Sequence, residues 1–148
     1  MAPPTVTLRE ITADTVRRIC ELRVAEAQQE SVASNAVSIA QAHFEPKAWF
    51  RAIYADEEPV GFLMLFDDPE KPVYYLWRLM IDERQQGQGF GRAAMALLID
   101  HVRTRPNATE LAVSWVPGEP GPALFYERLG FEPTGRVEHG EVEGRLRL

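Results

Sequence analysis

The feature that most constrains the fold is a run of three glycines between a strand-like segment and a helix-like one. The strand-like segment is 76–81, and Gly87, Gly89 and Gly91 follow it at alternate positions. The helix pattern begins at once and ends near Arg105-Pro106-Asn107, a helix stop signal. Its expected apolar stripe recurs at intervals of three and four residues: Phe90, Ala93, Ala94, Leu97, Leu98 and Val102.

This strand, loop and helix form a candidate anion site. Glycines let the backbone turn sharply and pass close to a ligand, and the first amides of a helix have no partner within it. The positive end of the helix dipole also favours an anion there, so the segment predicts a pyrophosphate cradle. The spacing fits neither the dinucleotide fingerprint nor the P-loop. A glycine-rich turn without a ligand is the alternative that three glycines leave open.

The other elements are predicted from periodicity and turn residues. We expect a first strand at 6–8, a helix capped by Thr12 and running to about Ala27, and a short helix that follows Ser34-Asn35 and runs through Ala42. The remaining expected elements are strands 49–55, 60–66, 73–81 and 110–116, a helix at 123–129, and closing strands 131–137 and 142–148. Because a helix joins them, strands 73–81 and 110–116 should be parallel.

Composition limits the function classes. A chain of 148 residues, 45% of them hydrophobic, predicts one domain over 1–148. The apolar runs are too short for a membrane helix and the N-terminus lacks a signal pattern, so we expect a cytoplasmic protein with no membrane partner. The single cysteine, Cys20, reads as a small buried hydrophobe, and the three scattered histidines give no metal site. A net charge of −6 argues against a nucleic-acid partner and favours a cationic substrate.

Two motifs in order carry a family resemblance. Residues 86–91 fit the [Gln/Arg]-x-x-Gly-x-[Gly/Ala] signature of the Gcn5-related N-acetyltransferases, and residues 122–131 resemble that family's A-x-x-x-Y-x-x-x-G-F segment. The resemblance extends from about Thr5 to Leu148. Segments 78–82 and 132–141 are similar to its bacterial spermine/spermidine acetyltransferase-like branch.

The resemblance implies an α/β (α+β) fold, a mixed and mostly antiparallel twisted sheet with a splayed parallel strand pair and flanking helices. It implies acetyl-coenzyme A as cofactor, with its pantetheine arm on the backbone of Leu79, Met80 and Ile81. The pyrophosphate would bind amides of the loop and first helical turn: Gln86, Gly87, Gln88, Gly89, Phe90, Gly91 and Arg92. By its place in the second motif, Tyr126 resembles the family's general acid near the coenzyme sulfur. The amide of Met80 or Ile81 would stabilise the oxyanion.

The expected reaction is direct acetyl transfer to a primary amine in a ternary complex, with a polyamine as the small-molecule candidate. The family often has Asn where this chain has Glu119. Glu119 therefore either faces the substrate amine or is only a surface residue of its turn. Candidate bases are Asp82, Glu83, Glu119 and Glu141, and Glu26 and Glu30 are further candidates for polyamine binding.

Three alternatives stay open. They are another amine acceptor (an amino acid, an antibiotic, a protein N-terminus or a lysine), a non-catalytic acyl-coenzyme A sensor, and an interaction domain without a ligand. By family analogy, edge strands near the C-terminus are candidates for a homodimer contact.

Overall fold

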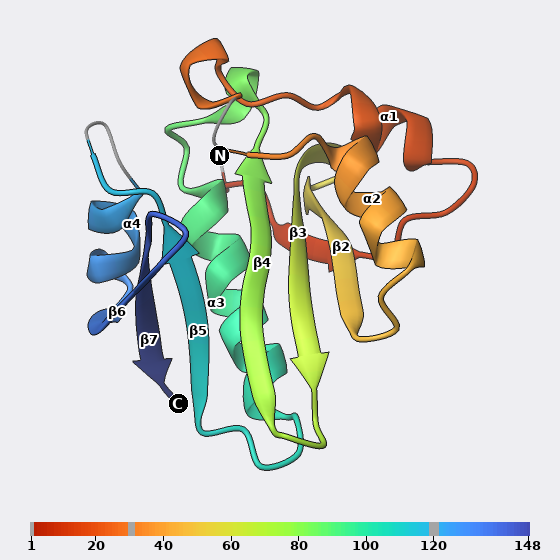
Figure 1. The fold of residues 1–148 in the computed structure, drawn as a ribbon. Helices are drawn as coiled ribbons and strands as arrows, with labels where there is room; N and C mark the ends of the chain where they lie inside the picture. Colours follow the sequence, from red (N-terminus) through yellow and green to blue (C-terminus); the bar gives the residue numbers. More distant parts are fainter. Residues whose placement is uncertain (1, 30–31, 119–121) are drawn as a thin grey trace.

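The computed structural model describes residues 2–29, 32–118 and 122–148 (Figure 1). Its framework is a seven-stranded sheet of order β1-β2-β3-β4-β5-β7-β6. The strands are β1 Val6–Arg9, β2 Ala48–Ala55, β3 Glu58–Asp68, β4 Val73–Ile81, β5 Glu110–Trp115, β6 Glu132–Glu138 and β7 Glu141–Arg147. The helices are α1 Val16–Glu21, α2 Asn35–His43, α3 Phe90–Arg103 and α4 Ala123–Arg128, with 3₁₀ turns η1 Glu26–Gln28 and η2 Glu83–Gln85.

The β4–β5 pair is the one parallel pair in this sheet, and it is paired only at Tyr75 with Ala112 and at Leu76 with Val113. Beyond those positions β4 continues to Ile81 alongside β3 alone. A register shift opposite Met64 and Leu65 leaves Trp77 as an extra residue in β4, which bends the strand. The two strands therefore open apart toward their carboxyl ends, as Figure 1 shows. The parallel pairing and the splay are both confirmed.

Helices cover the two faces of the sheet unequally. In Figure 1, α3 lies behind β4 and β5, and its buried side chains join the larger core cluster. On the opposite face α1 and α2 cover β2 and β3, where Ile19 packs with Phe62, Met64 and Met80. The part of that face around β5 and β7 is left without a covering helix in this view.

The expected apolar stripe of α3 is partly wrong. Phe90, Ala94, Leu98 and Val102 are buried as predicted, but Leu97 is 36% exposed. Met95 and Ile99 are buried in its place. The helix is therefore oriented so that Met95 and Ile99, together with Ala94 and Leu98, pack toward the sheet, whereas Leu97 does not.

The first helix is also much shorter than expected. It runs only from Val16 to Glu21, with Thr15 and not Thr12 at its N-cap, and it does not reach Ala27. Leu22 is already extended, and the backbone of Arg23 bonds to Asp82 and Glu83 across the molecule. Tertiary hydrogen bonding therefore ends a helix that local periodicity would continue.

Most other boundaries agree with expectation within one or two residues. Ser34 caps α2 by accepting a hydrogen bond from the Val37 amide at 3.2 Å. Strands β2 and β3 form a hairpin in which Asp56 takes a positive φ of 53°. Within the described ranges, no helix has the length and apolar character needed to cross a membrane.

Candidate functional site

The glycine loop leaves β4 at its end and delivers the chain into α3. Asp82 caps η2, and the side-chain Nε2 of Gln86 donates a hydrogen bond to the Ile81 carbonyl at 3.0 Å. Gly87 and Gly89 have φ values of 80° and 83°, which side chains other than glycine rarely adopt. A Cβ added to either glycine would meet nothing within 4 Å among the described residues, which leave open space over the loop.

The N-terminus of α3 is suited to bind an anion. Its N-cap residue is Gly89, no side chain in the described part of the chain caps it, and its first turn holds no acidic residue. The amides of that turn consequently lack side-chain acceptors and carry the positive end of a 14-residue helix. Arg92 lies exposed in the same turn. These residues fit a pyrophosphate group.

Tyr126 lies on α4 at the β5 side of the opening. Its ring stacks on Trp115, the last residue of β5, with centroids 5.6 Å apart, and meets Phe125 and Phe131 edge-on. Burial, and to a smaller degree the nearby Tyr75, raises the pKa of the Tyr126 phenol well above its ordinary value. The hydroxyl is protonated at neutral pH, as in an ordinary tyrosine, and can donate a hydrogen bond.

Helix α4 also contacts the start of α3. A Cβ added at Gly91 would lie 3.6 Å from both the Phe125 ring and Ile81. The end of β4, the first turn of α3 and the tyrosine-bearing helix thus meet at one place.

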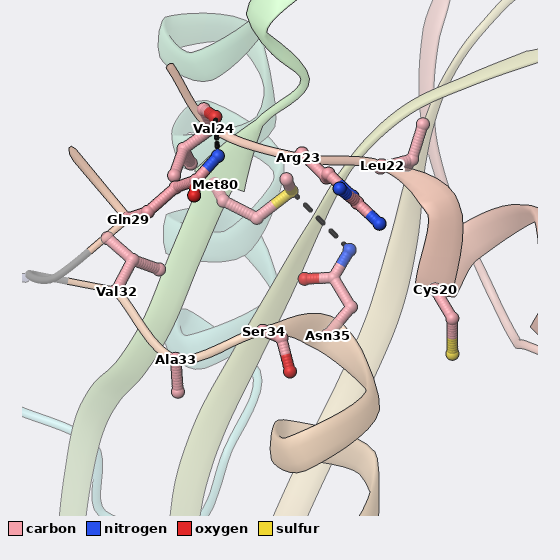
Figure 2. A pocket seen from close by; sticks show the side chains of 10 residues that line it. All are labelled: Cys20, Leu22, Arg23, Val24, Gln29, Val32, Ala33, Ser34, Asn35 and Met80. Atoms are coloured by element: carbon pink, nitrogen blue, oxygen red, sulfur yellow. Dashed lines mark hydrogen bonds between the residues drawn. The ribbon is translucent and has the colours of Figure 1, made fainter. Parts of the chain in front are cut away.

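A cavity of about 310 Å³ adjoins β4 on the sheet face opposite α3 (Figure 2). Met80 forms its wall on β4, and the rest comes from the segment joining α1 to α2 and from the ends of those helices. The lining residues are Cys20, Leu22, Arg23, Val24, Gln29, Val32, Ala33, Ser34, Asn35 and Met80. Asn35 donates to the Ile19 carbonyl at 2.8 Å and contacts the Met80 sulfur at 3.6 Å. Cys20 is half-buried and lines this cavity, so it is less buried than expected.

The carboxylates proposed from the sequence are not gathered at one point. Asp82 is buried, accepts from the Arg23 amide at 2.9 Å and pairs with Arg84 at 3.1 Å, which suits a structural clamp better than a free base. Glu83 lies exposed in η2, and Glu26 lies exposed in η1 near the cavity. Glu30 and Glu119 lie outside the described residues.

Glu141 is the candidate carboxylate on the uncovered face of the sheet. It is half-buried at the start of β7. On the same side of β4, Arg78 donates to Gln41 of α2 at 3.0 Å and to the Trp77 carbonyl at 3.1 Å. Burial lowers the pKa of the Arg78 guanidinium, while the nearby Tyr75 and Glu141 partly oppose this effect.

Sequence reasoning missed Trp115, Arg78 and the cavity as a whole, although Met80 in its wall was among the residues expected to hold the coenzyme. Trp115 ends a strand that the sequence predicts, so its position was visible but its stacking partner was not. Arg78 faces α2 beside the extra residue Trp77, and a bulge of this kind leaves no periodic signal.

Comparisons with known proteins agree with this geometry. The model of the family described as "Acetyltransferase (GNAT) family" matches residues 13–131. A spermine/spermidine N(1)-acetyltransferase of Bacillus subtilis (strain 168) is 26% identical over 143 residues, covering 90% of this chain and 91% of the relative. The crystal structure of an acetyltransferase from Thermus thermophilus has a TM-score of 0.77 at 19% identity and covers all of both chains. A GNAT family acetyltransferase from Elizabethkingia anophelis with acetyl-CoA bound has a TM-score of 0.69 at 15% identity, covering 97% of this chain and 98% of that one.

Proposed function

Because the chain belongs to the acetyltransferase (GNAT) family, we propose that it transfers the acetyl group of acetyl-coenzyme A to a primary amine, with a polyamine as acceptor. The observation that carries the proposal is the opening between β4 and β5 beside an uncapped α3 preceded by a glycine loop. When bound, acetyl-coenzyme A supplies an activated acetyl thioester.

Two parts of the chain would hold the coenzyme. The backbone of Leu79, Met80 and Ile81 runs along the opening without a β5 partner, which leaves one edge of β4 for a strand-like pantetheine arm. The amides from Gln86 to Arg92 would bind the pyrophosphate, helped by the helix dipole. The amide of Met80 or Ile81 would donate to the carbonyl oxygen as negative charge develops on it.

Tyr126 would act as the general acid. Its phenol is protonated at neutral pH, as an ordinary tyrosine is, and the ring stacks on Trp115 at the β5 side of the opening. The hydroxyl proton would pass to the departing sulfur, while the ring is held by aromatic contacts on three sides.

The amine would enter from the cavity side of Met80. Glu141 and Glu143, half-buried on β7, offer carboxylates on the uncovered sheet face, and Glu26 lies near the cavity. The net charge of −6 and the acceptor named for the Bacillus relative support a polyamine. Glu141 is the proposed base because Asp82 is occupied by its hydrogen bonds. A cytoplasmic location and a homodimer remain predictions.

The test is thiol release from acetyl-coenzyme A with a panel of amines that includes spermidine and spermine. We expect turnover with polyamines, and we expect Tyr126→Phe to lower kcat about 100-fold or more without a matching loss of coenzyme affinity. Tyr54→Phe is the matched control, because Tyr54 is equally buried but lies on β2. A Tyr126→Phe enzyme as fast as wild type would remove the assigned acid. Coenzyme binding without turnover of any amine would favour the sensor alternative.

A further inference from the structure

The glycine loop and the rim of the cavity are joined by hydrogen bonds. The rim is segment 22–29, which includes Leu22, Arg23, Val24 and Gln29 of the cavity lining. The adjoining part of the loop is segment 82–86. The two segments are about 60 residues apart in sequence, and the bonds between them run through both backbone and side chains.

Asp82 makes the first connection. Its Oδ1 accepts from the Arg23 amide at 2.9 Å, and the Glu83 amide donates to the Arg23 carbonyl at 2.7 Å. Both backbone groups of Arg23 are therefore held by the segment that begins the loop. The Asp82 side chain is almost fully buried. Loss of its hydrogen bond with the Arg23 amide would therefore leave a buried carboxylate oxygen without that partner and away from water.

Gln86 makes the second connection. Its Nε2 donates both to the Ile81 carbonyl and to Gln28 Oε1, each at 3.0 Å. Gln28 belongs to η1, and the next residue, Gln29, lines the cavity and bonds back to the Val24 carbonyl at 3.4 Å. A single side chain thus spans the end of β4 and the outer part of the rim.

We propose that Asp82 and Gln86 are positioning residues that transmit coenzyme binding at the loop to the shape of the acceptor cavity. This rests on the proposed function, since it requires the coenzyme to bind the loop. A ligand that restricts segment 82–86 also restricts segment 22–29 through these bonds, so the cavity is shaped for the amine when the coenzyme is present. By linkage, an amine in the cavity raises coenzyme affinity by the same factor.

Amide hydrogen exchange with coenzyme A as the probe tests this directly. In wild type, saturating coenzyme A slows exchange in the peptide covering 22–29 as well as in the loop. In Gln28→Ala the loop remains protected, but protection of 22–29 falls about fivefold, the effect of one lost hydrogen bond. Gln85→Ala is the matched control, because Gln85 bonds only to Gln88 within the loop among the described side-chain contacts. It should keep the wild-type pattern.

Variants of Asp82 provide a second test of the coupling. Asp82→Asn keeps an oxygen that can accept from the Arg23 amide and should retain the protection, whereas Asp82→Ala should lose it. With an amine that is turned over, Gln28→Ala should raise the KM for the amine about fivefold and leave nearly unchanged both kcat and the affinity for coenzyme A in the absence of amine. Since Gln28 is exposed, this variant is expected to fold even if Asp82→Ala does not.

The outcomes separate the two proposals. If coenzyme A does not bind, both the proposed function and the coupling are wrong. If it binds and protects the loop but leaves 22–29 unprotected, only the coupling is wrong. Equal protection of 22–29 in wild type and Gln28→Ala, with an unchanged amine KM, would also overturn the coupling.

Discussion

Arg78 is a positive charge on the sheet face from which a polyamine would approach. It lies two residues before Met80, and its guanidinium bonds to two neutral oxygens. A polycation near a half-buried guanidinium is repelled. We therefore expect Arg78→Gln to lower the KM for spermidine about two- to tenfold, measured by thiol release, with a smaller effect on a monoamine. Arg103→Gln, at an exposed position near the end of α3 on the other face of the sheet, removes the same charge away from this face as the control.

A higher KM for spermidine in Arg78→Gln would contradict the polyamine assignment. Together with turnover of amines that carry a carboxylate, it would mean that Arg78 binds an anionic group of the acceptor. The amino-acid alternative would then gain a specific residue.

His101 makes stability depend on pH. It stacks on Trp49 at 4.1 Å, and its buried Nε2 has no partner in the described part of the chain. Burial is the main cause that lowers its pKa below 6.5. As pH falls below about 6.5, the unfolded chain therefore binds this proton before the folded one, so stability decreases toward the lowered folded pKa. His101→Phe keeps an aromatic ring on Trp49 and should show a smaller fall in melting temperature between neutral and mildly acidic pH. His139→Gln, at an exposed position, should behave as wild type; an unchanged pH slope in His101→Phe would refute the assignment.

At the scale of elements, the junction between the loop and α3 can be tested with the two glycines on either side of Phe90. Gly89 has a φ of 83°, whereas Gly91 has an ordinary φ and its added Cβ would make only van der Waals contacts at 3.6 Å. Gly89→Ala should cost about 1–2 kcal/mol of stability and weaken coenzyme A binding, because the αL backbone penalises a side chain. Gly91→Ala should be tolerated in both respects. Denaturant unfolding and calorimetry would measure the two effects. If Gly91→Ala is the more damaging change, the cradle lies closer to Gly91 than to the αL glycine.

The sequence was most informative where an element is defined locally. Strand β4 agrees with expectation at both ends, and α3 begins at Phe90 directly after Gly89. It was least informative where distant contacts decide the backbone. The chain leaves α1 at Leu22 because Arg23 bonds to Asp82, a partner 59 residues away, and periodicity cannot report that bond. The rotation of α3 that exposes Leu97 likewise depends on the sheet beneath it.

The same limit holds for the site. The cradle and Tyr126 could be proposed because each lies in a contiguous motif. The cavity could not, since its lining combines residues from 20–29 and 32–35 with Met80, and its shape depends on the early end of α1. Arg78 and Trp115 were missed because a bulge and an inter-element ring stack are properties of the folded sheet.

At the scale of the whole molecule, the two substrates would meet opposite electrostatic fields. Under the proposed function, the coenzyme would be an anion at a helix N-terminus, while the acceptor would be a polycation approaching a chain with a net charge of −6. Raising ionic strength from about 0.01 M to about 0.15 M shortens the Debye length from about 30 Å to about 8 Å and so weakens long-range attraction.

We therefore expect the KM for spermine to rise with salt over this range, more steeply than the KM for a monoamine of similar length. The comparison controls for direct salt effects on the chemical step, since both acceptors use the same amine group and the same coenzyme. Steady-state thiol release at several salt concentrations measures both slopes. Equal slopes would mean that the acidic surface does not take part in acceptor capture, and that the acceptor is selected only by short-range contacts around Met80 and Glu141. A KM for spermine that falls with salt would show net repulsion at the entrance, and would move the choice of acceptor toward an amine that also carries negative charge.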